Sequence, residues 1–310
     1  MDLLLLSLVS FVVTFTLTPL HIRIFKGMGV VGRDRHKLTR PEIPEMGGIA
    51  IYLGILCSFL YIIVSDDVKV APYVLASITI VFIIGVIDDV FALRQRMKLA
   101  LLTVSALPLL LYNSGTLDLA MIEISFGVLY AICVIIGMAA SSNLTNILEG
   151  FNGESIGLGV ISTGFLILDA HILENETMMW ILVPVFFSLL AFLFFNKYPA
   201  KVFPGDTGTL MIGGAIGISV IIGGNVVLGI IVLIPQIMEF IIKSRVRFQG
   251  VKYGPTKVDE NGYLSPPPYL SVANMFTSKF RLKEYSLVLV IWALGALFGI
   301  ISLLITLFVL

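Results

Sequence analysis

The chain has 310 residues, of which 58% are hydrophobic and only 13% are charged, and its mean hydropathy is +1.02. These values exclude an ordinary soluble domain, in which about a quarter of the residues are charged, and they indicate an integral membrane protein. The net charge is zero, so the total charge points to no particular partner, and we expect no binding to nucleic acid.

Apolar stretches of bilayer-spanning length recur along the chain. A transmembrane helix needs roughly 20 apolar residues, and on this criterion we predict about ten, at 3–22, 47–65, 71–88, 98–114, 119–140, 155–172, 178–195, 208–224, 225–243 and 285–309. The eighth and ninth are separated only by Gly-Gly-Asn. We therefore expect an all-α, polytopic membrane protein in which residues 1–310 form a single domain.

The basic residues are distributed very unevenly between the two sides of this predicted bundle. Every Lys and Arg except Lys69 falls in, or directly beside, one set of alternate loops: 23–46, 89–98, 141–154, 196–207 and 244–284. Because Lys and Arg favour the cytoplasmic side, these loops are predicted to be cytoplasmic and both termini to lie outside. Most of the unusual polar residues fall in the same loops, so we expect an active site on the cytoplasmic face.

Two adjacent carboxylates follow the third apolar stretch, in the segment GVIDDVFALRQRMKLALL at 85–102. Asp88 and Asp89 would lie at membrane depth, where an unpaired charge is costly, and Lys98 begins the next predicted helix. A basic partner or a metal ion could offset this cost. The alternative is a pair of solvated acids at a helix end.

A polar segment, SSNLTNILEGFNGESIGLG at 141–159, interrupts two apolar spans. Asn143, Asn146 and Glu149 are spaced three residues apart and would share one face of a helix. Membrane proteins tolerate such interruptions where they line a cavity. An ordinary loop rich in Gly and Asn is the alternative.

Asp206 follows Pro-Gly and precedes an apolar helix predicted from about Gly208. Aspartate is a favoured N-cap and complements the helix dipole, so the residue could be a cap only. It could equally hold a cofactor at the membrane surface. Both interpretations are open on this segment alone.

Basic residues cluster in two of the predicted cytoplasmic loops, at 32–48 and 243–254. Arginine offers forked donors and lysine a point charge, which suit a polyphosphate. They suit anionic lipid headgroups equally well.

Together these features favour phosphoryl transfer. Carboxylate and amide oxygens, here from Asp88, Asp89, Asn146 and Asp206, are ligands that Mg²⁺ prefers alongside substrate phosphates. With Arg and Lys nearby on the same face, they could accelerate phosphoryl transfer by positioning and charge neutralisation. The sequence contains neither a G-x-x-x-x-G-K-[ST] phosphate loop nor an H-E-x-x-H motif.

Four ordered segments resemble one known family. They are PEMGG (44–48), DDVFALRQRMKL (88–99), NLTNILEGFNG (143–153) and NKYPAKVFPGDTGTL (196–210). The chain resembles, over about 33–285, the polyprenyl-phosphate N-acetylhexosamine-1-phosphate transferases, which include MraY, WecA and the eukaryotic dolichyl-phosphate GlcNAc-phosphotransferase. Ten helices and a cytosolic active face also match that family.

The resemblance implies a reaction and its partners. It implies that GlcNAc-1-phosphate passes from UDP-GlcNAc to a membrane polyprenyl (dolichyl) phosphate, giving polyprenyl-diphosphate-GlcNAc and UMP. This is the first step of lipid-linked glycan assembly for N-glycosylation. The implied cofactor is Mg²⁺, with Mn²⁺ as a substitute. The implied location is the cell membrane, or the endoplasmic reticulum membrane in a eukaryote, among membrane lipids and with a homodimer as one option.

The same resemblance implies roles for individual residues. Asn146 and Asp206 resemble the Mg²⁺ ligands, and Lys98 resembles the lysine on the diphosphate. Asp88 and Asp89 resemble the paired acids at the reacting centre, where we favour Asp88 as an aid to deprotonating or orienting the lipid phosphate. The remaining implied substrate-binding residues are Asn152 at the uracil, Phe203 near the base, Arg245 and Arg247 at phosphate, Glu45 near the sugar, and Lys37, Asn143 and Asn196.

Departures from the family pattern help to indicate which branch of the family the chain resembles. Val246 stands between the two arginines where the eukaryotic enzyme has His, and the loop lacks the histidine cluster of MraY-type enzymes. This argues against UDP-MurNAc-pentapeptide as donor. The segment IPE at 43–45 and the Arg-x-Arg pattern at 245–247 resemble the dolichol-type branch, and because the chain is more compact than the eukaryotic members we infer an archaeal enzyme. Glu149 stands where many members have Asp, and we leave it outside the predicted site. The same reaction with another UDP-N-acetylhexosamine, for a cell-wall or surface polysaccharide, is the alternative.

Two other classes of protein, secondary transporters and structural lipid-binding scaffolds, were considered as alternatives. Acids within the membrane and broken helices also mark ion pathways in secondary transporters, but we find no internal repeat, and the polar residues gather at one face. A structural lipid-binding scaffold would not need two acids together with asparagines.

Overall fold

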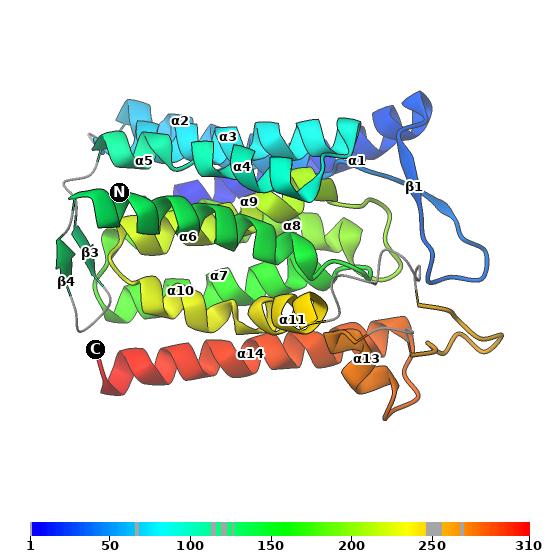
Figure 1. The fold of residues 1–310 in the computed structure, drawn as a ribbon. Coiled ribbons are helices and arrows are strands. Elements are labelled where there is room, and N and C mark those ends of the chain that lie inside the picture. The colour runs from blue at the N-terminus through cyan, green and yellow to red at the C-terminus, as the bar shows by residue number, and fades with distance from the viewer. Residues whose placement is uncertain are drawn as a thin grey trace.

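The computed structural model describes residues 2–65, 68–112, 116–118, 123–125, 127–245, 256–266 and 270–310. Its long helices run side by side as a bundle (Figure 1). Eight of the described helices are long and apolar enough to cross a membrane. They are α1 (Leu3–Met28), α2 (Gly48–Ser65), α3 (Ala71–Phe91), α6 (Gly127–Ile147), α7 (Glu154–Ile172), α8 (Glu176–Asn196), α9 (Gly205–Ile222) and α14 (Glu284–Phe308). The predicted all-α, polytopic membrane fold is confirmed.

The stretch predicted as one span at 225–243 is divided by a sharp bend. It forms α10 (Val226–Val232) and α11 (Ile234–Arg245), whose axes differ by 65°. Pro235 is the second residue of α11, and a proline cannot donate the backbone hydrogen bond that would continue the helix through this point. Counted as one span, the pair is a ninth candidate among the described residues.

The stretch predicted at 98–114 is also divided. It forms α4 (Gln95–Val104) and α5 (Leu107–Tyr112), which follow one another along α3 (Figure 1). Pro108 near the start of α5 again removes a backbone donor. Neither helix alone has spanning length, so the predicted number of ten spans stays a prediction.

Helix α6 lies several residues later in the chain than predicted. The beginning of the stretch predicted as helical at 119–140 contains β4 (Glu123–Ser125), which pairs antiparallel with β3 (Thr116–Asp118). Polar and apolar residues alternate within each of these short strands, which is the period of a strand. Helix α6 continues to Ile147, so the first half of the predicted loop 141–154 is helical.

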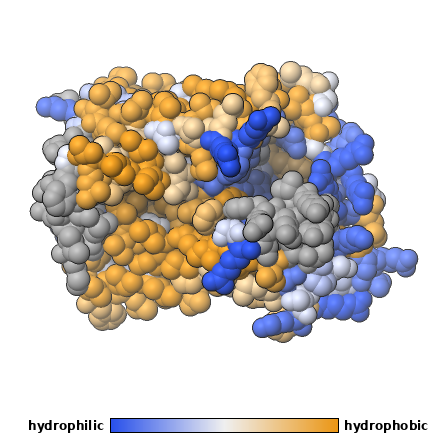
Figure 2. Space-filling model, viewed as in Figure 1, coloured by the Kyte–Doolittle hydropathy of each residue, from blue (hydrophilic) through white to orange (hydrophobic). Residues whose placement is uncertain are grey.

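One end of the bundle carries most of the polar, non-helical structure. There β1 (Val31–Arg33) pairs antiparallel with β2 (Glu42–Pro44), and the hairpin projects beyond the helices at the same end of the bundle as the short helix α13 (Val272–Thr277) (Figure 1). In the face seen in Figure 2, hydrophilic side chains gather at this end, whereas the sides of the helices are hydrophobic. Both chain termini lie at the opposite end of the bundle (Figure 1).

Helix α9 is the most deeply buried of the spanning helices and packs against α3, α6, α2 and α8. Two glycines of its neighbours permit this contact at its N-terminal turn. A Cβ atom on Gly48 would lie 2.2 Å from the backbone nitrogen of Gly208, and one on Gly85 would lie 2.6 Å from the Cα of Thr207. Small residues let membrane helices approach closely. Here they bring the start of α9 against the start of α2 and the end of α3.

Candidate active site

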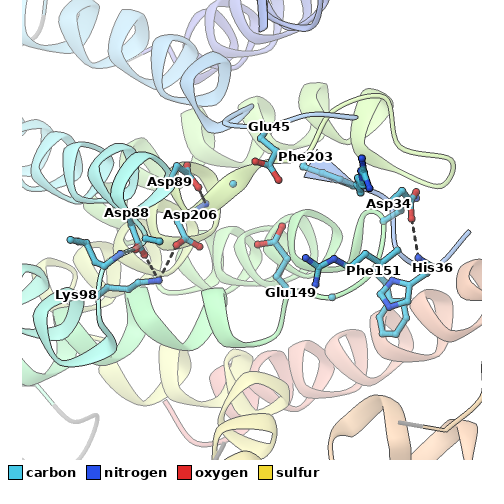
Figure 3. Close-up of a pocket in the computed structure, with 17 residues that line it drawn as sticks. Asp34, His36, Glu45, Asp88, Asp89, Lys98, Glu149, Phe151, Phe203 and Asp206 are labelled. Carbon is cyan, nitrogen blue, oxygen red and sulfur yellow. Dashed lines mark hydrogen bonds and ion pairs between the residues drawn. The ribbon is translucent and has the colours of Figure 1, made fainter. Parts of the chain in front are cut away.

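A cavity of about 570 Å³ opens at the polar end of the bundle (Figure 3). All four sequence segments singled out above contribute to it, although they are far apart in the chain. Its lining residues are Arg33, Asp34, Arg35, His36, Glu45, Asp88, Asp89, Ala92, Leu93, Lys98, Glu149, Gly150, Phe151, Asn152, Phe203, Gly205 and Asp206. The cavity therefore combines carboxylates, basic groups and aromatic rings.

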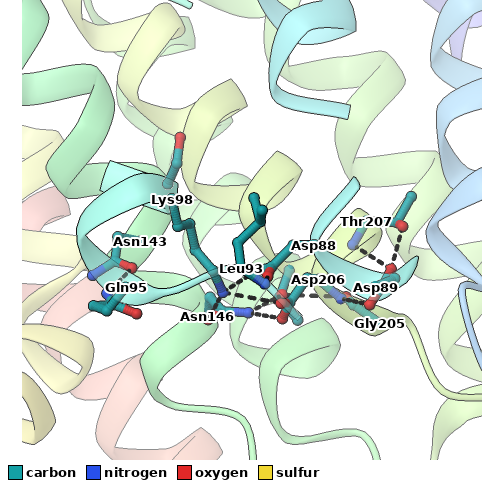
Figure 4. Close-up of polar contacts among 12 residues, drawn as sticks. Asp88, Asp89, Leu93, Gln95, Lys98, Asn143, Asn146, Gly205, Asp206 and Thr207 are labelled. Atoms are coloured by element: carbon teal, nitrogen blue, oxygen red, sulfur yellow. Dashed lines mark hydrogen bonds and ion pairs between the residues drawn. The ribbon is translucent and has the colours of Figure 1, made fainter. Parts of the chain in front are cut away.

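Lys98 joins the predicted catalytic acids (Figure 4). Its Nζ forms ion pairs with Asp88 and, at 2.9 Å, with Oδ2 of Asp206. It also donates to Oδ1 of Asn146 at 3.3 Å. Lys98 is 6% exposed and Asp88 4%, so the alternative of two solvated acids is wrong for Asp88. The predicted basic partner is present.

Asn146 lies beside Asp206 rather than in the cavity wall (Figure 4). Its Nδ2 donates to Oδ1 of Asp206 and, at 3.0 Å, to Oγ1 of Thr209. The two residues predicted as metal ligands are thus adjacent, and Lys98 contacts both of them.

Asp89 caps α9. Its Oδ1 accepts the backbone N–H of Asp206 at 2.8 Å, and its Oδ2 accepts both the backbone N–H of Thr207, at 2.9 Å, and the Thr207 hydroxyl. These are donors of the first helical turn that have no partner within the helix. The interpretation of Asp206 as the cap of its own helix is therefore wrong, and its side chain is free to face Lys98.

The end of α3 fixes Asp88. After Phe91 the chain turns through Ala92, whose φ is 48° and whose N–H is bonded to the Asp88 carbonyl oxygen at 2.8 Å. The turn directs the backbone N–H of Leu93 at Oδ1 of Asp88, at 2.7 Å. One carboxylate oxygen is thereby held by the backbone, and the other meets Lys98.

Glu149 lines the cavity, although we left it outside the predicted site. Figure 3 shows its carboxylate turned into the cavity toward that of Glu45. Burial, followed by the negative charges of Asp206 and Asp89, raises the pKa of Glu149 well above its usual value. Burial and the same two aspartates also raise the pKa of Glu45. The spacing of Glu149 from Asn146 was the sequence signal for this residue.

The other side of the cavity is aromatic and basic. Phe203 and Phe151 line it, and the ring of His36 lies 4.4 Å from that of Phe151 between centroids. Burial lowers the pKa of His36 to about 4. Sequence reasoning missed Asp34, His36 and Phe151, although Phe151 lies within the motif at 143–153. Arg33 and Arg35 belong to the basic cluster at 32–48, which was predicted to suit a polyphosphate or lipid headgroups.

Asn152 belongs to this side and is held from two directions. Its Nδ2 donates to Oδ2 of Asp34 at 2.9 Å, and its backbone N–H donates to Oε1 of Glu284 at 2.9 Å. All three residues are buried, with exposed fractions between 2% and 4%.

Several predicted substrate-binding residues do not line this cavity. The Nζ of Lys37 pairs with Asp34, Oδ1 of Asn143 accepts from Gln95 at 2.7 Å, and Nδ2 of Asn196 donates to the Val202 carbonyl at 2.9 Å. These polar side chains have protein partners in this structure, and their contact with substrate stays a prediction. Arg245 is exposed at the end of α11, and Arg247 lies outside the described residues.

The donor set in the cavity fits a hard divalent cation. The carboxylates of Glu45, Asp89, Glu149 and Asp206 face one space, and the side chains of Glu45 and Glu149 have no hydrogen bond or ion pair within the described residues. Oxygen donors with excess negative charge are what Mg²⁺ requires. Asp34, His36 and Glu284 also offer ligand atoms within 4.8 Å of one another, but Lys37 already neutralises Asp34 there.

Comparison with known proteins places this chain in a family. Residues 71–224 match glycosyl transferase family 4. A protein of Saccharolobus solfataricus is 36% identical over 95% of this chain and 94% of its own length, and its provisional name is UDP-N-acetylglucosamine–dolichyl-phosphate N-acetylglucosaminephosphotransferase. The chain belongs to the polyprenyl-phosphate N-acetylhexosamine-1-phosphate transferase family. The resemblance seen in the four motifs is thus confirmed, and the chain is a glycosyl-1-phosphate transferase.

Other relatives distinguish branches of this transferase family. A Sulfolobus acidocaldarius protein with the same provisional name is 34% identical over 97% of this chain and 95% of its own length. The phospho-N-acetylmuramoyl-pentapeptide-transferase of Halalkalibacterium halodurans is 33% identical over 77% of this chain and 83% of its own length. The archaeal similarity covers nearly the whole transferase, which agrees with the predicted archaeal branch.

Proposed function

We propose that this transferase moves GlcNAc-1-phosphate from UDP-GlcNAc to a dolichyl or related polyprenyl phosphate, releasing UMP. The observation that carries the proposal is the junction of Lys98 with Asp88, Asp206 and Asn146 beside an acidic cavity. The names of the archaeal relatives supply the donor sugar and the lipid.

The reaction exchanges one phosphoanhydride bond for another. An oxygen of the lipid phosphate forms a bond to the β-phosphorus of UDP-GlcNAc. The bond from that phosphorus to the bridging oxygen breaks, and the oxygen leaves with UMP. Because two polyanions must meet, catalysis depends on positioning and charge neutralisation.

Lys98 is suited to bind the diphosphate. Its ammonium group lies among three oxygen-bearing side chains at the cavity, and a phosphate oxygen could replace one of them. Asp88, held by the Leu93 backbone N–H, is suited to orient the lipid phosphate or accept its proton. Arg33 and Arg35 in the cavity wall add positive charge.

A divalent cation completes the charge balance. Asp206 and Asn146 would hold it, with the neighbouring carboxylates of Glu149 and Asp89 within the same space. When bound, Mg²⁺ neutralises diphosphate charge. The excess of carboxylates in the cavity supports this assignment.

The nucleotide fits the aromatic side of the cavity. Phe203 and Phe151 offer ring faces, and Asn152 offers an amide for the edge of the uracil. The sugar would then lie toward Glu45 and Glu149. A neutral His36 beside Phe151 adds no charge at neutral pH.

We also propose ten membrane passes, with the polar end of the bundle in the cytoplasm of a cell membrane and both termini outside. Both termini lie at the end of the bundle opposite the polar end (Figure 1), which supports an even number of passes. The basic loops support the orientation. A homodimer stays a prediction.

Release of UMP tests the proposal. Purified protein is incubated with Mg²⁺, a polyprenyl or dolichyl phosphate, and UDP-GlcNAc, UDP-GalNAc or UDP-MurNAc-pentapeptide in turn. We expect UMP release that requires the lipid and is fastest with UDP-GlcNAc. Release with none of the donors would overturn the transferase assignment, and faster release with another donor would correct only the sugar.

A further inference from the structure

The buried contact between Asp34 and Asn152 has a consequence for nucleotide selection. Asp34 lies in the turn after β1 and Asn152 lies between α6 and α7, and the sequence separation is 118 residues. Both side chains line the cavity, and they are 2% and 4% exposed. Their hydrogen bond is therefore a fixed part of the cavity wall rather than a surface contact.

The contact determines which way the Asn152 amide faces. A carboxylate in an ion pair with a lysine, as Asp34 is with Lys37, offers only acceptors. The amide nitrogen must then point at Asp34, as observed at 2.9 Å. Rotating the amide by half a turn would place its carbonyl oxygen against the carboxylate, leaving two acceptors facing each other.

The orientation of the backbone is fixed as well. The backbone N–H of Asn152 donates to Oε1 of Glu284, the first residue of α14, at 2.9 Å. The next residue, Gly153, has φ +80°, and a Cβ there would lie 3.1 Å from the Cα of Lys197. Asn152 is consequently held by one acid through its main chain and by another through its side chain.

We infer that Asp34 is a specificity-determining residue, which locks the Asn152 amide so that the site accepts uracil and rejects cytosine. The inference rests on the proposed function, in which Asn152 meets the base. With one N–H engaged by Asp34, the amide retains one N–H and its carbonyl oxygen. That pair complements a uracil carbonyl and the N3–H beside it.

Cytosine presents the reverse pattern, with an acceptor at N3 and a donor at N4. The amide could satisfy cytosine only after the half-turn that Asp34 opposes. A site built to hydrogen-bond one partner rejects an analogue because buried polar groups are then left unpaired. Asp34 acts through Asn152 and need not touch the base.

The test compares the binding of UMP and CMP to the full-length protein in detergent by titration calorimetry. Wild type is expected to prefer UMP by about tenfold or more. Asp34→Asn offers Asn152 both a donor and an acceptor, so either amide orientation becomes acceptable. We expect the preference to fall several-fold, mainly because CMP binds more tightly.

A matched variant isolates the effect. Glu42→Gln changes an exposed acid of the same hairpin, which pairs with Arg33, and it should leave the UMP preference unchanged. An unchanged UMP-to-CMP ratio in Asp34→Asn would overturn the inference.

A third variant covers the case in which Asp34→Asn does not fold. Asn152→Ala removes the amide itself and should bring the affinities for UMP and CMP close together. A retained uracil preference in Asn152→Ala would overturn the inference even if the protein turns over UDP-GlcNAc. Wild-type protein that binds neither nucleotide would overturn both the inference and the proposed function.

Discussion

The carboxylate of Asp89 holds the first turn of α9 through the backbone N–H of Thr207, at 2.9 Å. Asp89, which follows Asp88 near the end of α3, is therefore a structural partner of the helix that carries Asp206. Two adjacent acids have different tasks: one faces Lys98, and the other fixes the position of α9.

Replacing Asp89 should reduce both stability and activity. Asp89→Ala removes the acceptors for two backbone N–H groups, and loss of a helix cap costs about 1–2 kcal/mol. We expect a lower melting temperature in detergent and a large loss of UMP release. Asp89→Asn keeps one acceptor oxygen and should recover part of the melting temperature. Equal melting temperatures for wild type and Asp89→Ala would contradict the capping role.

Asp206→Ala should separate activity from folding. The side chain contacts Lys98 and Asn146 but caps nothing, so α9 should keep its cap. We expect UMP release to fall by on the order of a hundredfold or more, with little change in melting temperature. Thr209→Val, which removes only the hydroxyl bonded to Asn146, is the milder comparison. Near-wild-type turnover in Asp206→Ala would refute the proposed metal and diphosphate site.

Asn152→Ala should affect substrate binding more than turnover. Its amide contacts Asp34 in the cavity wall, where we propose that the base binds. We expect the KM for UDP-GlcNAc to rise by about tenfold, in line with loss of buried hydrogen bonds, and kcat to fall by less. Steady-state kinetics with saturating lipid phosphate measure both. A lower kcat with an unchanged KM would argue against a base contact.

Glu149 should make the protein less stable as the pH rises. A carboxyl group whose pKa is higher in the folded protein binds more protons when folded, so stability falls as pH rises from the unfolded value of 4.5 toward the raised value. We expect the melting temperature in EDTA to decline over this range, and to decline less in Glu149→Gln. Added Mg²⁺ should reduce the difference between the two proteins. If the melting temperatures of wild type and Glu149→Gln changed equally with pH in EDTA, the raised pKa of Glu149 would not be lowering the stability of the folded protein.

Hydropathy and charge predicted the class of fold, because burial in lipid requires long apolar helices and basic residues favour one side. They did not predict the breaks in two spans, although Pro108 and Pro235 were visible signals of them. Apolar content alone also misplaced the start of α6, where a short β-hairpin precedes the helix.

The candidate site was predictable as a set of segments but not as a set of contacts. Asp88 and Lys98 are ten residues apart, and a buried acid needs a nearby cation, so their pairing follows from local sequence. The cap on α9 comes from a residue 117 positions earlier, which no local pattern encodes. The contact of the Asn196 amide with the Val202 carbonyl is likewise visible only in the tertiary structure, because the motif shows an asparagine but not its partner.

Gly85 is a position at which a small substitution would disturb the packing of α9 against α3. A single methyl group there would press on the backbone of Thr207 and on the carbonyl oxygen of Asp206, at 2.6 and 2.8 Å. The substitution would push α9 away from α3 and separate Asp206 from Lys98 without altering one reactive group. In a genetic screen for inactive enzymes, Gly85→Ala would be indistinguishable from the loss of a catalytic side chain, although Gly85 is not among the residues that line the cavity.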